Sequence, residues 1–394
     1  MHSDIKYYPV NWMDGMRIGK SQFDDSNSFI LDHLRDAICL SLNNLNYGLL
    51  HTNHYKENPS LKMSVQFSNN AFIEVQLEHC KASCPDGSRI DVQPVHKCHL
   101  KTSFQTLASS LNLNLSSDNY FYIVVQVNQH NRRPFGEPNP EEVPPRHPYT
   151  IPNYQISVVP IKDYEPEQGY RSQLPIGKIG YINGHLVEIP GYVPPCMTVG
   201  SHIKLNTQLK EIREMLNRME QSAYKVIQRA YQKGTTQSVI AANISGYCKE
   251  FIRFHNQHML FFQWIASNLP PVFLAETLGK MWVSLRAYFE MLPVSEREET
   301  MDYLSEWMNI GKGDLDQRMF FFKQAEYNHN DLGTLFVNIV DNIRFFEELF
   351  SRLSQLEFIG KRRGQSLLIN ERGGERERKS KRDEGFNKFS SLME

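Results

Sequence analysis

One stretch near the middle of the chain constrains its fold more than any other. Over four heptads its apolar residues recur at alternating spacings of four and three, without interruption. This spacing is typical of a helix that packs side by side with other helices. At ~1.5 Å per residue, the predicted helix is roughly 40 Å long. The residues that form the pattern are Leu205, Leu209, Ile212, Leu216, Met219, Ala223, Val226 and Ala230.

The residue types in this heptad pattern bear on the oligomeric state. One repeating position holds Leu and Ala, and the other holds Leu, Ile, Met and Val. β-Branched residues at the second position favour three or more strands in parallel coiled coils. We therefore predict that the eight residues form a trimerisation seam shared between subunits. The alternative is a helix that packs in the core of its own chain.

Length and composition set the broad class of the protein. A chain of 394 residues is too long for one ordinary core, so two or three domains are expected. A net charge of −1 gives no general attraction to nucleic acid or to anionic lipid. No apolar run resembles a secretory signal or a membrane helix, and six scattered cysteines suit a reducing compartment. We expect a cytoplasmic protein that neither binds nucleic acid nor inserts into a membrane.

Residues before the heptad pattern have the period-two alternation of β-strands. A short helix is predicted from about residue 25 to 43, and Pro85-Asp86-Gly87 is predicted as a hairpin turn. Together these features predict an antiparallel β-sandwich over residues 25–200. The expected strands lie at 65–67, 72–77, 90–92, 120–127, 156–161 and 186–189.

A proline-rich segment interrupts the predicted strands at residues 133–152, which hold seven prolines. Proline lacks an amide donor and resists both a helix and a β-ladder. A loop of this length inside a domain is usually functional or disordered. We therefore predict an irregular loop that serves as a docking surface for a partner.

Residues 201–360 are predicted to form an antiparallel helical bundle. Ser295 and Glu298 form a potential capping box, and Asp331 is a potential cap for the last helix. The tryptophans of this region, Trp264, Trp282 and Trp307, are expected in the core. Residues 361–394 hold ten Lys and Arg against six acidic residues and are predicted to be a mobile tail. This tail would either be solvated or bind a partner that carries acidic groups or phosphates.

Motifs for catalysis are missing from the sequence, which has no G-x-S-x-G, no H-E-x-x-H and no dinucleotide fingerprint. Cys80, Cys84 and Cys98, with the histidines at 79, 96 and 99, have separations that allow a tetrahedral zinc site. However, adjacent strand residues point to opposite faces of a sheet, so ordinary strand residues are the favoured interpretation. We predict a protein that is not an enzyme and that holds no metal or cofactor.

Five short motifs occur in an order that resembles the TssK family, the trimeric baseplate subunit of bacterial type VI secretion systems. The first is Trp12-x-Asp14-Gly15-Met16, with Phe23 following. The others are Tyr47-Gly48-Leu49-Leu50, Pro85-Asp86-Gly87, Leu174-Pro175-Ile176-Gly177-Lys178-Ile179 and Tyr192-Val193-Pro194-Pro195. Five pieces in the family's order, across about residues 6–300, are hard to obtain by chance.

The resemblance implies an α+β multidomain protein that assembles as a homotrimer. Its β-sandwich would be akin to the shoulder of phage receptor-binding proteins, followed by a long helix and a helical bundle. Residues 1–24 would bind baseplate wedge proteins similar to TssF and TssG, through Trp12, Asp14, Gly15, Met16 and Phe23. The trimer would link these wedge proteins to the envelope complex at the inner face of the cell envelope.

One expectation departs from the family pattern. Family members carry a further C-terminal head domain, whereas here only the basic tail follows the bundle, as expected of a divergent, Bacteroidetes-like version with other envelope proteins. The tail or the bundle tip would contact those proteins. An alternative function is a phage-like adhesin whose β-sandwich binds carbohydrate.

Overall fold

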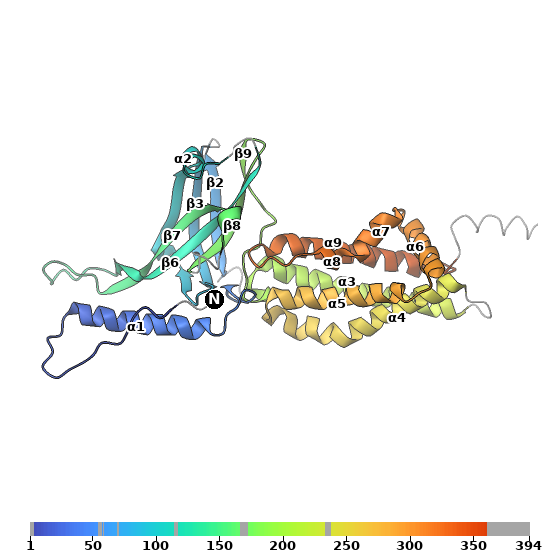
Figure 1. Ribbon diagram of the computed structural model, residues 1–394, viewed down its shortest axis with the longest axis horizontal. Helices are drawn as coiled ribbons and strands as arrows, with labels where there is room; N and C mark the ends of the chain where they lie inside the picture. The colour runs from blue at the N-terminus through green and yellow to red at the C-terminus, as the bar shows by residue number, and fades with distance from the viewer. Residues whose placement is uncertain are drawn as a thin grey trace, which may run out of the picture. The chain divides into compact units, whose positions relative to one another are not determined.

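The computed structural model describes residues 4–360, except 54–56, 58, 69–70, 114–116, 166–171 and 233–237. Antiparallel sheets precede a helical region along the chain, which confirms the predicted α+β multidomain class (Figure 1). The described residues group into two compact units that interleave in sequence. Unit 1 holds the residues up to Arg213, Leu260–Thr277 and Ala325–Asp341, and unit 2 holds Glu214–Met259, Leu278–Gln324 and the described residues from Asn342 on.

The first sheet of unit 1 is built around its long central strand, β3 (Phe72–Ser83). All other strands of this sheet pair with β3 in antiparallel register. The predicted turn at Pro85-Asp86-Gly87 is confirmed, because it joins β3 to its neighbour β4 and Gly87 has a φ of +86°. The partner strands are β1 (Gly48–Leu49), β2 (Leu61–Ser68), β4 (Arg89–Val92) and β5 (Cys98–Ser103).

The second sheet has the strand order β7-β6-β8-β9, all antiparallel. Its central strand β6 is buried on both faces from Phe121 to Val125, as its unbroken apolar run predicts. The short helix α2 (Phe104–Ser110) precedes β6 along the chain, and β5 of the first sheet lies against β7 of the second. The strands are β6 (Asn119–Phe135), β7 (Tyr149–Pro160), β8 (Gln173–Ile182) and β9 (His185–Glu188).

The proline-rich segment is more regular than predicted. β6 and β7 extend into it as a hairpin, in which Arg132 pairs with Pro152 and Pro134 pairs with Thr150. The prediction of an irregular loop over all of 133–152 is therefore wrong. The ladder tolerates proline here because β7 is an edge strand, and because β8 pairs with β6 only as far as Gln126.

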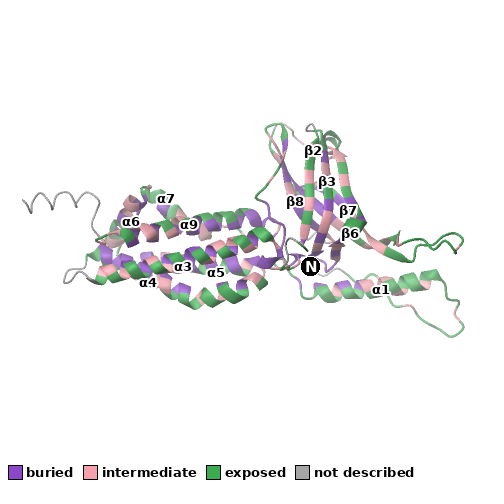
Figure 2. Ribbon diagram, turned by 180° about the vertical axis from the view of Figure 1, so that it is seen from behind, coloured by how far each residue is buried: buried purple, intermediate pink, exposed green. Residues whose placement is uncertain are grey.

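Helix α1 (Lys20–Cys39) begins five residues before the predicted start. The side chain of Gln22 accepts a hydrogen bond from the backbone N–H of Gly19 at 2.8 Å, which satisfies one of the free donors at the helix start. Most of the helix is exposed (Figure 2). Its buried residues are Asp32, Arg35 and Cys39, so the face turned towards the protein is largely polar.

The helical region follows the predicted order, with two differences in detail. Helix α6 begins at Val294 with Pro293 as its N-cap, so Ser295 lies inside the helix and the predicted capping box is wrong. Two short helices, α7 and α8, were not predicted. The helices are α3 (Ile203–Gln232), α4 (Val239–Leu260), α5 (Pro271–Glu290), α6 (Val294–Met308), α7 (Lys312–Met319), α8 (Phe321–Gln324) and α9 (Leu332–Gln355).

The heptad pattern lies on α3 and is packed within a single chain. Leu205, Leu209, Ile212, Leu216, Met219, Ala223 and Val226 are at most 1% exposed, and Ala230 is half-buried. In unit 2, Arg218 of α3 pairs with Glu347 of α9 at 3.3 Å, and Glu220 lies 3.5 Å from His255 of α4. This packing is that of the alternative, a bundle helix in its own core. A trimer, which stays a prediction, needs another surface.

The three tryptophans of the helical region differ in burial. Trp282 is buried against Phe322 and Phe346, with ring centroids 5.2 and 5.9 Å away. Trp307 is half-buried beside Tyr303. Trp264 is 63% exposed, so its predicted core position is wrong. Trp264 lies in a π-helical turn at Phe261–Ile265, in which Phe262 is buried.

Candidate functional site

An N-terminal arm, residues 4–19, precedes α1 in unit 1 and carries exposed apolar side chains. Trp12 is 50% exposed, and Tyr8 and Met13 more so. The N–H of Met16 donates to the carbonyl of Met13 at 3.1 Å, and Gly15 supplies the left-handed φ of +78° that this turn requires.

The five predicted partner-binding residues therefore lie on the arm and on the first turn of α1. Trp12, Asp14, Gly15 and Phe23 are exposed and Met16 is half-buried. The structure brings them into one short segment of unit 1 and leaves most of them accessible.

A buried ion pair on α1 holds the start of this arm. The carboxylate of Asp32 accepts hydrogen bonds from the backbone N–H groups of Lys6 (2.5 Å) and Tyr7 (3.2 Å). Its other oxygen accepts from the Nε of Arg35 at 2.9 Å. Burial acts to raise the pKa of Asp32, but the Lys6 N–H and the Arg35 guanidinium outweigh it, so the net shift is downward. Asp32 is thus held as a carboxylate. We call this arrangement the clasp.

The clasp continues into the turn after β3. Arg35 donates from Nη1 to the backbone carbonyl of Asp86 at 3.3 Å. The Asp86 carboxylate in turn accepts from the N–H of Ser88 (2.9 Å) and the hydroxyl of Ser172 (2.6 Å). A Cβ on Gly87 would lie 2.2 Å from the carbonyl oxygen of Arg35, so only glycine fits against α1. The Pro85-Asp86-Gly87 motif therefore anchors α1.

A polar cavity of about 860 Å³ lies beside the clasp, lined by residues of the arm, α1, the turn and β6. The ring of Tyr7 stacks on His130 of β6, with centroids 4.4 Å apart. Burial lowers the pKa of His130. The arm is thus attached at two points, by backbone donors to Asp32 and by an aromatic stack on the second sheet.

The outward face of α1 is apolar. Phe23, Ile30, Leu34 and Ile38 fall at helical spacing and are each 44–62% exposed. A helix that buries an ion pair and exposes its apolar stripe is the reverse of the usual arrangement, and exposed apolar surface of this kind marks protein interaction sites. Together with the arm, this stripe is the candidate binding surface of unit 1.

The remaining motifs lie together at a second position in unit 1, around Tyr47. We call this position the junction, and its contacts stabilise the fold. Leu49 donates to the carbonyl of Pro195 at 2.8 Å, and a Cβ on Gly48 would lie 2.2 Å from the Pro195 backbone. His329 is buried, and its Nε2–H donates to the carbonyl of Tyr47 at 2.8 Å. The Tyr47–Leu50 and Tyr192–Pro195 motifs therefore lie side by side, joined by a backbone hydrogen bond and by the close approach of Gly48 to Pro195.

The Leu174–Ile179 motif lies in β8 and joins the same place. Lys178 pairs with Asp331 at 2.6 Å, both largely buried. One carboxylate oxygen of Asp331, the predicted cap of the last helix, is therefore paired with Lys178 of β8. A Cβ on Gly177 would lie 2.7 Å from the side chain of Met63, so this glycine allows close packing on β2.

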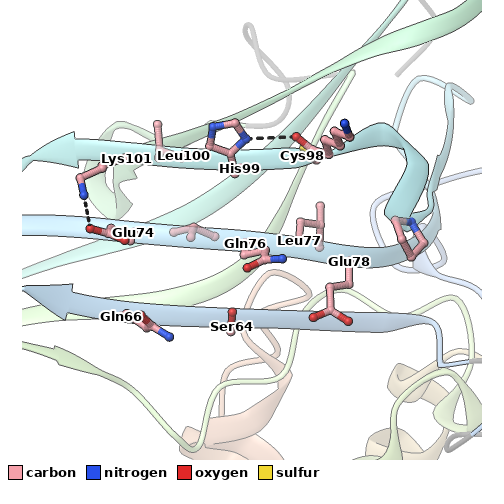
Figure 3. Close-up of a pocket in the computed structure, with 13 residues that line it drawn as sticks. Ser64, Gln66, Glu74, Gln76, Leu77, Glu78, Cys98, His99, Leu100 and Lys101 are labelled. Carbon is pink, nitrogen blue, oxygen red and sulfur yellow. Dashed lines mark hydrogen bonds and ion pairs between the residues drawn. The ribbon is translucent and has the colours of Figure 1, made fainter. Parts of the chain in front are cut away.

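The outer face of the first sheet bears on the carbohydrate alternative. A groove of about 510 Å³ runs over β2, β3 and β5, with Gln66, Gln76, His99 and their neighbours along it (Figure 3). Glu74 and Lys101 on this face pair with each other at 2.5 Å. Among the described residues that line the groove there is no Trp, Tyr or Phe on which a sugar ring could stack. The described lining of the groove therefore gives the carbohydrate alternative no support.

The cysteines do not form a metal centre with their neighbours. Among the described residues, no three or more His, Cys, Asp or Glu side chains are placed to hold one ion. Cys80, Cys84 and Cys98 are buried with free thiols. Burial raises the pKa of Cys80 to about 12 and that of Cys98 to about 11, so both thiols are protonated at neutral pH. Within the described part of the chain, no helix has the length and apolar character to cross a membrane.

Sequence reasoning missed the clasp. Asp32 and Arg35 have opposite charges three residues apart on a helix, which by itself indicates only a surface pair. Nothing local shows that this face packs on a turn fifty residues later. Leu34 and Ile38 lie on the opposite face of this helix, which is exposed.

No protein-family model and no curated protein matches the chain. Among solved structures, the chain is similar to a crystal structure of TssK, with 12% identity over 88% of this chain and 72% of that one, at a TM-score of 0.49. It is also similar to a chain of the type VI secretion baseplate complex (13%, 88% and 99%, TM-score 0.48). A third is a chain of the TssK-TssF-TssG baseplate subcomplex (12%, 89% and 100%, TM-score 0.45).

Proposed function

We propose that this chain is a non-enzymatic structural subunit of a type VI secretion baseplate. In this proposal it is a cytoplasmic homotrimer at the inner face of the cell envelope, and it links wedge proteins similar to TssF and TssG to the envelope complex. One observation carries the proposal. The five motifs of the sequence resemblance, spread over more than 180 residues, occupy two places in unit 1, the arm with its clasp and the junction around Tyr47.

The division of labour between these two places supports a scaffold role. The junction consists of buried groups and of Gly48, which has no room for a Cβ, so it serves packing. The arm has Trp12 and Met13 exposed, and α1 adds Phe23. Exposed aromatic side chains are the groups that most often dominate the binding energy at protein interfaces. The arm is therefore the part that we assign to the wedge proteins.

Co-purification with wedge proteins of the same secretion system tests this assignment. We expect Trp12→Ala combined with Phe23→Ala to weaken capture at least about tenfold, because two large apolar contacts are lost. Tyr224→Ala is the matched control, since Tyr224 is an exposed aromatic of unit 2. Undiminished capture by the double variant, or an equal loss in the control, would overturn the role of the arm.

The basic tail at residues 361–394 lies outside the described residues. We propose that it, or the bundle tip, contacts envelope proteins. Deletion of 361–394 is expected to leave wedge capture intact and to reduce secretion. Unchanged secretion by the truncated protein would refute this part of the proposal.

A further inference from the structure

The clasp holds the arm close to the side chains that we assign to binding. Asp32 accepts hydrogen bonds from the backbone N–H groups of Lys6 and Tyr7, and Trp12 lies only five residues beyond Tyr7. Since an extended chain covers about 3.6 Å per residue, the attachment keeps Trp12 within roughly 18 Å of Tyr7. Figures 1 and 2 show the arm running along α1 and turning back into its start. The arm is therefore a loop that is tied to unit 1 at both ends.

The two charged residues of the clasp lie too deep to contact a partner protein. Asp32 and Arg35 are 2% and 8% exposed, against 50% for Trp12. Both carboxylate oxygens of Asp32 bond within unit 1, one to the arm and the other to Arg35. Any effect of Asp32 on binding must therefore act through the arm or through α1.

The clasp connects the arm to both sheets of unit 1. Arg35 donates to the carbonyl of Asp86 in the turn after β3, and the Asp86 carboxylate accepts from the hydroxyl of Ser172, directly before β8. The ring of Tyr7 stacks on His130 of β6. An arm that is fixed on strands in this way loses little conformational entropy on binding, whereas a free arm would have to be ordered by its partner.

We propose that Asp32 and Arg35 are positioning residues for the binding surface. They hold the arm in the conformation in which its exposed side chains bind the wedge proteins, and they do not contact those proteins themselves. This inference rests on the proposed function, in which the arm binds the wedge proteins. It adds that the affinity depends on a buried ion pair and two backbone N–H groups as well as on the exposed apolar side chains.

A single proline tests the attachment and leaves the ion pair intact. Lys6→Pro removes the backbone donor that lies 2.5 Å from Asp32, because proline has no N–H. Lys6→Ala is the matched control, since it keeps the N–H and shortens only an exposed side chain. The full chain is titrated with purified TssF-like and TssG-like proteins of the same secretion system. The Kd should rise about tenfold in Lys6→Pro, with faster hydrogen exchange at Tyr7, and stay unchanged in Lys6→Ala.

Asp32→Ala removes the same attachment from the side of α1. Its Kd should rise at least about tenfold, and the addition of Lys6→Pro should cause no further loss, because both changes release one attachment. A second loss of similar size in the double variant would show independent effects and overturn the proposal. Circular dichroism must show Asp32→Ala to be folded, and the two Lys6 variants decide the question if it is not.

The remaining outcomes separate this proposal from the proposed function. Wild-type affinity in Lys6→Pro overturns the positioning role, as does an equal loss in Lys6→Ala or a loss without faster exchange at Tyr7. The baseplate assignment then stands, provided that Trp12→Ala with Phe23→Ala still weakens capture. Undiminished capture by that double variant overturns the role of the arm and the positioning role together.

Discussion

The ammonium group of Lys178 lies 2.6 Å from the Oδ2 of Asp331, and the two residues are 153 positions apart in the sequence. Their side chains are only 18% and 9% exposed. The pair joins β8 to the residue that precedes α9, and both belong to unit 1. A buried pair of this kind fixes the register of two elements because each charge needs the other.

Removal of one partner from this pair is expected to destabilise the protein strongly. Asp331→Ala leaves the Lys178 ammonium largely buried without its carboxylate, at a cost on the order of 3 kcal/mol in the free energy of unfolding. The double variant Lys178→Met with Asp331→Ala should recover part of this loss. Denaturant unfolding of Asp331→Ala, of Lys178→Met and of the double variant checks the prediction, and a strictly additive double variant would contradict it.

Gly48 and Gly15 form a matched pair of left-handed glycines. Gly48 has a φ of +117° and no room for a Cβ beside Pro195, whereas Gly15 has a φ of +78° with nothing within 4 Å. Gly48→Ala should therefore cost more than about 2 kcal/mol, and Gly15→Ala only about 1 kcal/mol. Thermal unfolding compares them. Equal losses in the two variants would show that close packing at Gly48 is unimportant.

His329 should make stability depend on pH. Burial lowers the pKa of His329 to about 4, against about 6.5 for an unfolded histidine. Between these values the unfolded state binds a proton that the folded state does not, so stability falls as the pH drops from 6.5 to 4, by at most about 3 kcal/mol. His329→Gln should remove this part of the slope in unfolding measured across that range.

Asp32 should keep the arm attached across the physiological pH range. Its pKa is lowered in the folded protein, so its stabilisation is complete above the unfolded value near 4 and is lost only as the pH falls through the lower folded value. Hydrogen exchange at Lys6 and Tyr7, corrected for intrinsic rates, should therefore be equally slow at pH 5 and pH 8. Asp32→Ala should exchange fast at both. Faster exchange at pH 5 in the wild type would contradict this role.

Local sequence patterns predict most of the helices and strands and their order along the chain. Alternation at Val65 and Phe67, the apolar run at Tyr120–Val127 and the heptads from Leu205 each specify a local conformation and an apolar side. The Pro85-Asp86-Gly87 turn is specified in the same way, because only glycine accepts its φ without strain. These properties depend on neighbours a few residues away, so they can be read from the chain.

Local patterns do not predict which surface each face packs against. The heptad residues of α3 could pack equally well against another subunit or against α4 and α9 of the same chain. Their burial shows that they pack within the chain. The apolar stripe of α1 is left outside because Asp32 and Arg35 find the arm and the Asp86 turn as partners. Trp264 lies in a π-helical turn and is exposed, whereas Phe262 of the same turn is buried. In each case the outcome depends on competition between contacts far apart in sequence, and local pattern contains no information about which contact is more stable.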